Sequence, residues 1–301
     1  MTLRIIVTGK TGQVGRALYA RLQGGHEVIA LGRDDLNLET WGKTSSLFDE
    51  FSPDLIINAA AYTDVEKAED EETLAHLINT ELPHRLSELA QRCNAGFIHF
   101  STDYVFDGTK TKPYLETDTP NPINAYGRSK LGAEQQIAAT CDAWIVARLS
   151  WVYAETGNNF LNTMLSLFTK QQILKVVADQ SGAPTPAFVI ADVIARIIDQ
   201  VPSKDFYDFL TNNRGLLHIA CRGHTSWWEF TKMIASLSEA GGLKVVTKQI
   251  VPIPTANYWG QAQRPMNSRL DIGRLKNTFG IKPPCWTNAL ESVIKRRLAL
   301  K

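Results

Sequence analysis

The stretch Leu3-Arg-Ile-Ile-Val-Thr-Gly9-Lys-Thr-Gly12-Gln-Val-Gly15 decides the fold of this chain, because it joins a short apolar run to a glycine-rich turn. The spacing is G-x-x-G-x-x-G, and residues 14–22 behind it have a helical pattern. Glycine lets the backbone turn tightly and approach a pyrophosphate, whose charge the N–H groups at the helix start then stabilise. A glycine triplet alone can be a plain structural turn. Its place at the first strand–helix junction is what predicts a dinucleotide site.

Strands and helices alternate through the first half of the chain. Continuous apolar runs predict buried strands over residues 3–7, 27–31, 54–58, 97–100 and 143–149. Helices are predicted over residues 14–22, 41–51, 73–93 and 125–139, with Pro83 kinking or breaking the third. This alternation is typical of an α/β fold with a doubly wound parallel sheet, the Rossmann architecture.

The pattern changes after about Trp151. Helices are predicted over residues 160–170, 189–200, 227–238 and 287–298, and the connections between them are longer and rich in proline and glycine. Long ordered loops in a compact protein are more often functional than structural. We therefore expect a dinucleotide-binding domain over residues 1–150 and a smaller substrate-binding lobe over residues 151–301, with some segments of the lobe returning to the sheet.

Composition excludes several classes of protein. The 301 residues are 44% hydrophobic and 21% charged, which is ordinary for a globular chain and unlike a disordered or fibrous one. Thirty-two basic against 31 acidic residues leave a net charge of +1, too little for bulk binding to nucleic acid or an anionic membrane. The four cysteines form no C-x-x-C pair, and no apolar run approaches about 18 residues. We expect a soluble, cytoplasmic protein with no nucleic-acid or membrane partner.

The predicted tip of the second strand bears on the choice of cofactor. An acidic residue there binds the ribose 2′-hydroxyl of NAD, whereas an arginine holds the 2′-phosphate of NADP. Gly32 occupies the tip and Arg33 follows, so NADPH is predicted at least as readily as NADH, with Asp35 and Leu36 near the adenine. The alternative is that Arg33 is a solvent-exposed loop charge.

Three small residues, 59–61, follow the third predicted strand and precede Tyr62 and Thr63. Small side chains at the carboxyl end of a central strand let a ligand lie close to the backbone. They also allow tight packing of a helix on the sheet. Both interpretations stay open for this segment.

Tyr126 and Lys130 are the most informative pair in the sequence. They lie four residues apart on a predicted helix and so project from one face. A lysine ammonium near a phenol lowers the phenol pKa, which makes tyrosine a usable acid near neutral pH. A strand-end hydroxyl, Thr102, lies about 20 residues earlier and could hydrogen-bond a substrate carbonyl. The glycine turn, the strand-end hydroxyl and the Tyr/Lys pair, in this order, form a specific signal.

With these motifs the sequence resembles the extended short-chain dehydrogenase/reductases, and within them the dTDP-4-dehydrorhamnose reductases. The segments that carry the resemblance are GKTGQVG at 9–15, NAAAYTDVEKAE at 58–69, STDYVFDG at 101–108, NPINAYGRSK at 121–130, RLSWVY at 148–153, GNNF at 157–160, DQSGAPT at 179–185 and RPMNSRL at 264–270. They cover the chain almost end to end. The segments in the second half separate this family from general nucleotide-sugar epimerases.

The resemblance implies a role for each matching residue. Tyr126 would be the proton donor, Lys130 its partner and a ligand of the nicotinamide ribose, and Thr102 the contact to the substrate carbonyl. Asp103, Tyr104 and Trp151 would meet the sugar. The cofactor would be NADPH or NADH, and the residues implied to bind it, besides Tyr126 and Lys130, are Gly9, Gly12, Gln13, Val14, Gly15, Gly32, Arg33, Asp35, Leu36, Ala61, Tyr62 and Thr63. The implied partner is a nucleotide sugar, and the protein would be a monomer or a homodimer.

Several residues have plainer interpretations. Some relatives dimerise around Mg²⁺ held by C-terminal acidic residues, but the last predicted helix here is basic, so no metal is expected. Trp151 could be simply buried, and Trp227 and Trp228 are expected to pack. His99, inside a predicted strand, is expected to be a core residue with its hydrogen bonds satisfied, and the cysteines are expected to be inert.

Three functions stay open at this stage. The first is NAD(P)H-dependent reduction of the C4 keto group of dTDP-4-dehydro-L-rhamnose, which gives dTDP-L-rhamnose for cell-surface polysaccharide. The second is a non-catalytic nucleotide-binding regulatory subunit of the methionine adenosyltransferase type, which would be free to lose Thr102, Tyr126 and Lys130. The third is another nucleotide-sugar reductase or an epimerase. Dehydration is disfavoured, because Asp103 is not followed by a glutamate.

Overall fold

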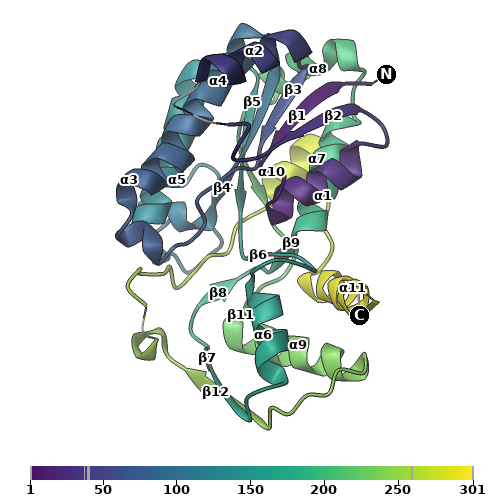
Figure 1. Ribbon diagram of the computed structural model, residues 1–301. Helices are drawn as coiled ribbons and strands as arrows, with labels where there is room; N and C mark the ends of the chain where they lie inside the picture. Colours follow the sequence, from purple (N-terminus) through teal and green to yellow (C-terminus); the bar gives the residue numbers. More distant parts are fainter. Residues whose placement is uncertain (1, 37, 39–40, 259, 300–301) are drawn as a thin grey trace.

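The structure is a computed structural model that describes residues 2–36, 38, 41–258 and 260–299. Its centre is a sheet of six parallel strands in the order β10-β5-β4-β3-β1-β2 (Figure 1). The strands are β1 (Arg4–Thr8), β2 (Glu27–Leu31), β3 (Leu55–Asn58), β4 (Gly96–Thr102), β5 (Trp144–Leu149) and β10 (Gly215–Ile219). The predicted fold class, a doubly wound parallel sheet, is confirmed.

Helices cover both faces of this sheet (Figure 1). On one face pack α1 (Gln13–Leu22), α7 (Ala187–Ile198), α8 (Phe206–Asn212) and α10 (Gly273–Phe279), and on the other α2 (Trp41–Phe51), α4 (Leu82–Arg92) and α5 (Ala125–Thr140). Along β1, Ile5 and Val7 join the first core and Ile6 joins the second. Burial on both faces is why these strands read as continuous apolar runs.

The helix predicted over residues 73–93 is not a single α-helix. It consists of α3 (Glu72–His76), a π-helical turn (Leu77–Glu81) and then α4. Pro83 is the second residue of α4 and has no backbone N–H, and directly before it the π-helical turn ends with Leu82 N–H donating to Leu77 O. The predicted break is therefore a change of helical pitch just before the proline.

A smaller lobe lies below the sheet in Figure 1. It contains α6 (Phe160–Phe168), α9 (Trp227–Ala240), α11 (Trp286–Ala299) and the parallel pair β7 (Ile173–Val177) and β12 (Gln249–Ile253). The short elements are β6 (Val152–Tyr153), β8 (Ser181–Gly182), β9 (Thr185–Pro186), β11 (Thr225–Ser226) and the 3₁₀ turns Lys67–Glu69, Asp103–Val105, Ser203–Asp205 and Thr255–Asn257. An aromatic core that includes Tyr153, Phe230 and Trp286 holds the lobe together.

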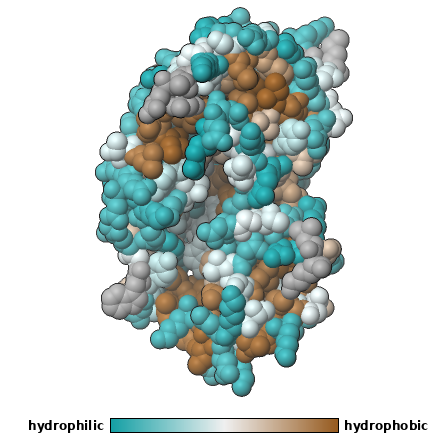
Figure 2. All heavy atoms as spheres, in the orientation of Figure 1, coloured by the Kyte–Doolittle hydropathy of each residue, from teal (hydrophilic) through white to brown (hydrophobic). Residues whose placement is uncertain are grey.

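The strands of the sheet end toward this lobe, since β5 runs directly into β6. Figure 2 shows the molecular surface hollowed between the two parts. Ligands of open parallel sheets bind at the carboxyl ends of the strands, so this hollow is where a site is expected. Among the described helices, none has both the length and the apolar character that crossing a bilayer requires.

Candidate active site

The turn between β1 and α1 has the geometry of an anion-binding loop. Gly9 has a φ of +76°, and a Cβ on it would lie 2.5 Å from the carbonyl oxygen of Ala59. Gly12 N–H donates to Gly9 O at 2.9 Å, and a Cβ on Gly15 would lie 2.2 Å from that same oxygen. No side chain in the described part of the chain caps α1 at Gly12. Its first N–H groups are therefore free to bind a phosphate.

Two cations stand at the tip of β2. Lys10 Nζ lies 2.8 Å from Asp35 Oδ2, and the same oxygen accepts the N–H of Gly32 at 2.8 Å. The Gly32 bond and then the Lys10 bond lower the pKa of Asp35. Arg33 is exposed beside them. Sequence reasoning found Arg33 but missed Lys10, although Lys10 directly follows the first glycine of the turn.

The loop after β3 is fixed to the helix that carries the Tyr/Lys pair. Tyr62 N–H donates to Asn79 Oδ1 at 2.9 Å, and Asn79 Nδ2 donates to Tyr62 O at 3.0 Å. The same Nδ2 reaches Ser129 Oγ on α5 at 3.0 Å. The segment 61–63, expected to bind the cofactor, is thus held at a fixed position relative to α5, the helix that carries Tyr126.

Thr102 ends β4, and Tyr126 lies in the first turn of α5. Thr102 Oγ1 donates to Asp103 Oδ1 at 3.0 Å and accepts the N–H of Tyr104 at 3.2 Å. Asn124 caps α5 by accepting the N–H of Gly127 at 2.7 Å. The hydroxyl of Thr102 also lies near enough to the Tyr126 phenol to lower its pKa. The structure therefore brings the predicted carbonyl contact and the predicted proton donor together.

The expected effect of Lys130 on Tyr126 is absent from the free protein. Burial raises the pKa of Tyr126 to about 12. The nearby Thr102 hydroxyl acts in the opposite direction and lowers this pKa, but by less. Lys130 is 1% exposed, and its Nζ lies 3.0 Å from His99 Nε2. Burial lowers the pKa of Lys130 to about 7, while Glu134 raises it. The predicted depression of the phenol pKa is wrong for this state, because the lysine contacts His99 and loses charge by burial.

Asp103 contacts Thr102, and Tyr104 lies beside Tyr126. Asp103 is buried, and its Oδ2 accepts a hydrogen bond from Ser150 Oγ at 3.1 Å. Burial raises the pKa of Asp103 to about 6, although three side-chain hydroxyls hydrogen-bond it and act in the opposite direction. The ring of Tyr104 meets the ring of Tyr126 edge on, with centroids 6.0 Å apart.

Trp151 lies just beyond β5 in a strained conformation. Its φ is +47°, which bulky residues rarely adopt outside functional sites and tight turns. The indole stacks on Trp227, and a Cβ on Gly182 would lie 2.3 Å from the Trp151 ring. The ring is therefore packed by Trp227 and Gly182 while its residue stands at the ligand edge of the sheet.

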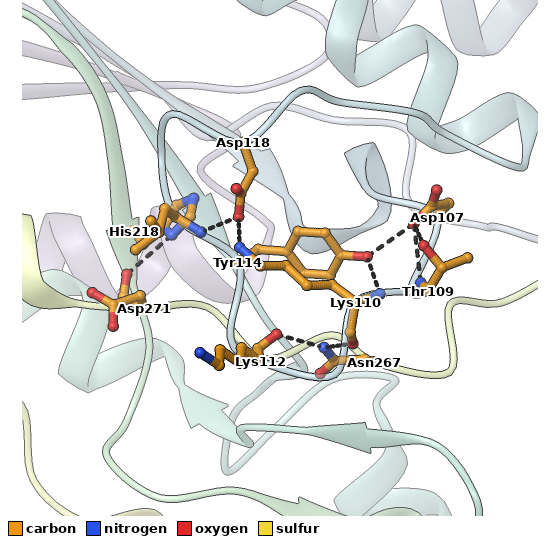
Figure 3. A network of polar contacts seen from close by, with 10 residues as sticks. Asp107, Thr109, Lys110, Lys112, Tyr114, Asp118, His218, Asn267 and Asp271 are labelled. Atoms are coloured by element: carbon orange, nitrogen blue, oxygen red, sulfur yellow. Dashed lines mark hydrogen bonds and ion pairs between the residues drawn. The ribbon is translucent and has the colours of Figure 1, made fainter.

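The loop after β4 is pinned by a polar network, shown in Figure 3. Tyr114 Oη donates to Asp107 Oδ1 at 2.9 Å. Asn267 Nδ2 donates to the carbonyl oxygens of Lys110 and Lys112 at 2.6 and 2.9 Å. These bonds hold the loop after β4 against the RPMNSRL segment.

A second set of bonds joins the segment after β3 to the RPMNSRL segment and the residues before it. Glu66 Oε1 pairs with Arg264 Nη2 at 2.6 Å, and Glu66 Oε2 accepts the N–H groups of Gln261 and Ala262 at 2.7 and 3.0 Å. Sequence reasoning did not pair Glu66 with Arg264, although both lie in segments that carried the resemblance. The two are 198 positions apart, and only the fold brings them together.

Comparison with known proteins agrees with this geometry. Residues 3–299 match the family described as RmlD substrate binding domain. A dTDP-4-dehydrorhamnose reductase from Burkholderia thailandensis is 40% identical over 99% of this chain and 100% of that protein. A spore coat polysaccharide biosynthesis protein, SpsK, from Bacillus subtilis is 34% identical over 98% of each chain. The crystal structure of dTDP-4-dehydrorhamnose reductase from Bacillus anthracis in complex with NADP superposes with a TM-score of 0.88 at 31% identity, covering 98% of this chain and 100% of that one.

Proposed function

The chain belongs to the RmlD substrate binding domain family, and we propose that it reduces the C4 keto group of dTDP-4-dehydro-L-rhamnose with NAD(P)H to give dTDP-L-rhamnose, a precursor of cell-surface polysaccharide. The observation that carries this proposal is that Thr102 ends β4 close to Tyr126, which lies with Lys130 on α5. Three bacterial proteins named dTDP-4-dehydrorhamnose reductase match 94% to 99% of the chain.

The residues at the glycine turn fit a dinucleotide. Gly9 lets the turn lie directly against the backbone that follows β3, and the uncapped start of α1 offers N–H groups to a pyrophosphate. Lys10 and Arg33 would hold a 2′-phosphate, which favours NADPH. When bound, the cofactor supplies a hydride. Segment 61–63 and Lys130 would hold its nicotinamide ribose.

Side chains of the protein orient the substrate carbonyl and supply the proton. Thr102 orients the C4 oxygen, and Tyr126 gives its phenolic proton to that oxygen as negative charge develops on it. Asp103, Tyr104 and Trp151 would contact the sugar. Because the phenol is the acid, it has to be protonated when the substrate binds, and the pKa of about 12 in the free protein meets that need.

The test is incubation of the purified protein with dTDP-4-dehydro-L-rhamnose and NADPH, following loss of the reduced nicotinamide absorbance and identifying the sugar product. Tyr126→Phe is the matched control, since it removes one oxygen and keeps the ring. A regulatory subunit would bind nucleotide without turnover. An epimerase would return a 4-keto sugar with the cofactor unchanged. Either result would contradict the proposed reaction.

We assign the reaction to the cytoplasm and to a monomer or homodimer, with a nucleotide sugar as the partner. Sedimentation of the purified protein, with and without cofactor, tests the oligomeric state. A species larger than a dimer would contradict this assignment.

A further inference from the structure

A buried chain of hydrogen bonds runs from β1 through β3 and β4 to the catalytic lysine. Thr8 is paired with Asn58 in the sheet register, and Asn58 is paired with His99. Thr8 Oγ1 donates to Asn58 Oδ1 at 2.6 Å, and Asn58 Nδ2 lies 3.0 Å from His99 Nδ1. His99 Nε2 lies 3.0 Å from Lys130 Nζ. These four side chains are all 1% exposed or less.

The neighbours of Asn58 fix the orientation of its amide. The backbone N–H of Ala60 can only donate, and it lies 3.1 Å from Asn58 Oδ1. That atom must therefore be the carbonyl oxygen, and the group facing His99 must be the NH₂ end, which can only donate. His99 Nδ1 consequently accepts, and the neutral imidazole carries its proton on Nε2.

This tautomer directs an N–H group at Lys130. An ammonium has three donors and no acceptor, so it cannot bond to an Nε2–H group. A neutral amine has a lone pair and accepts that hydrogen. The pKa values agree in direction: burial lowers the pKa of His99 well below its ordinary value and lowers that of Lys130 to about 7.

Other charged groups near Lys130 are already engaged. Glu134, one turn further along α5, accepts hydrogen bonds from Ser101 and Arg148 at 2.5 to 2.9 Å. Its charge raises the pKa of Lys130, against the effect of burial. Tyr126, one turn earlier, is protonated in this state. From β3 the facing group is the uncharged amide of Asn58, which reaches Lys130 through His99.

We propose that Asn58 and His99 are positioning residues that stabilise the neutral amine of Lys130, so that its amine and ammonium forms interconvert near neutral pH. The catalytic consequence of this inference rests on the proposed reductase function, whereas the tautomer of His99 does not. Reduction moves the Tyr126 proton to the sugar oxygen and leaves a phenolate. The Lys130 ammonium returns one proton to that phenolate and becomes the amine that His99 Nε2–H stabilises. Solvent then restores the ammonium, so the protons balance over one turnover.

The tautomer can be observed without any activity. In the free protein labelled with ¹⁵N-histidine, long-range ¹H–¹⁵N correlation spectra distinguish the two neutral forms for the six histidines, and His99→Gln assigns the signal. We expect His99 to be neutral with its proton on Nε2 at pH 8 to 9, above the pKa of Lys130. A proton on Nδ1 in the unmodified protein would overturn the proposal.

Asn58→Asp tests the catalytic consequence. A carboxylate cannot donate to Nδ1, so the His99 proton moves to Nδ1 and Nε2 becomes an acceptor for the ammonium. The variant keeps an oxygen for Thr8 and Ala60. The ammonium form is the active one, so kcat/KM for NADPH in the unmodified protein falls as the pH rises through the pKa of Lys130. In Asn58→Asp the midpoint of this fall moves up by about 1 pH unit or more.

Thr8→Val is the matched control, because it removes one bond to the Asn58 oxygen while Ala60 N–H still fixes the amide. In Thr8→Val the pH midpoint of the fall in kcat/KM should equal that of the unmodified protein. If Asn58→Asp does not fold, His99→Gln replaces it, since the amide oxygen of glutamine can accept from the ammonium and moves the midpoint in the same direction. An unmoved midpoint in the folded variant would overturn the proposal, because a purely structural role lowers kcat without moving it. Failure of the unmodified protein to turn over the sugar would instead refute the proposed function and leave the tautomer result standing.

Discussion

Trp151 and Trp227 stack face to face, with ring centroids 3.5 Å apart and planes 7° from parallel. The pair joins the end of β5 to the first residue of α9, so one contact couples the sheet to the smaller lobe. Trp227 Nε1 also donates to Gln180 Oε1 at 3.1 Å, which fixes the plane of the stack. The expectation that Trp227 only packs is therefore incomplete, because it determines where the Trp151 ring lies.

Trp151→Ala should weaken productive binding of the sugar and leave cofactor binding unchanged. Trp151 stands past β5 at the ligand edge, away from the glycine turn that would bind NADPH. Loss of a stacked aromatic contact of about 0.5–1.5 kcal/mol beyond its buried area raises KM for the sugar by roughly tenfold or more. Trp227→Ala should give a smaller change of the same kind. Equal losses of NADPH affinity and sugar turnover would show that Trp151 is a packing residue.

Tyr126→Phe should lower kcat by about 10²–10⁴, the usual contribution of a general acid, while the protein stays folded. Lys130→Met should be comparably damaging. The double variant should lose far less than the product of the two single losses, because groups that act as one unit are non-additive. Steady-state kinetics with circular dichroism as the folding control measures this. A loss below about threefold for Tyr126→Phe would end the tyrosine mechanism.

The sequence predicted the elements whose pattern is set by burial on both sides. The strands expected over 3–7, 27–31, 54–58, 97–100 and 143–149 are confirmed within about two residues as β1 to β5. The strand β10 was not predicted, because it lies at the edge of the sheet and begins with the half-buried Gly215. In β7 exposed and buried residues alternate at first, which a search for continuous apolar runs does not detect.

In the candidate site, too, the sequence predicted some features and not others. Motif spacing located Thr102, Tyr126 and Lys130, since each stands at a strand end or on one helix face. It could not show that Asn58 lies against His99, because that contact depends on the register between β3 and β4, 41 positions apart. His99 was expected to be a satisfied core residue, and its two ring nitrogens are indeed hydrogen-bonded. Its contact with Lys130 is visible only in the folded structure.

NADPH should be used at least as readily as NADH. Lys10 and Arg33 place positive charge at the tip of β2, where a 2′-phosphate would lie. Lys10→Met and Arg33→Met should each lower kcat/KM for NADPH by roughly tenfold and leave that for NADH nearly unchanged. A preference of the unmodified protein for NADH above about tenfold, or 1.4 kcal/mol, would contradict this assignment.

The buried ion pair between Arg148 and Glu134 should matter for stability. Arg148 is 0% exposed, its Nη2 lies 2.6 Å from Glu134 Oε2, and its Nε lies 2.9 Å from Oε1. Arg148→Met leaves a buried carboxylate without its partner and should reduce the free energy of unfolding by about 3–5 kcal/mol. Arg148→Met combined with Glu134→Gln should recover part of that loss, since the uncompensated charge is gone. Urea denaturation of the two variants and the unmodified protein measures these changes, and a loss below about 1 kcal/mol for the single variant would contradict the assigned role.

The stability of the fold should fall with acid between about pH 6.5 and pH 4.5, because two histidines are buried in neutral form. Burial, aided by Arg148, lowers the pKa of His218 to about 3, and burial lowers that of His99 well below 6.5. Below pH 6.5 the unfolded chain binds these two protons and the folded chain does not.

Asp103 acts in the opposite direction over part of this range. Burial raises its pKa to about 6, so between pH 6 and its ordinary value of 3.8 the folded chain binds a proton that the unfolded chain lacks. Each unmatched proton changes the free energy of unfolding by about 1.4 kcal/mol per pH unit. Two histidines against one aspartate leave a net loss of about 1.4 kcal/mol per pH unit below pH 6.

His218→Phe isolates one of the two histidines. Its Nδ1 contacts Asp271 O at 3.0 Å, so the variant loses some stability at every pH, but the readout is the slope. Urea denaturation from pH 7 to pH 4.5 should show that the variant no longer loses stability below pH 6, because one histidine and Asp103 then cancel. A slope equal to that of the unmodified protein would mean that His218 is protonated in the folded state, contrary to its burial beside Arg148.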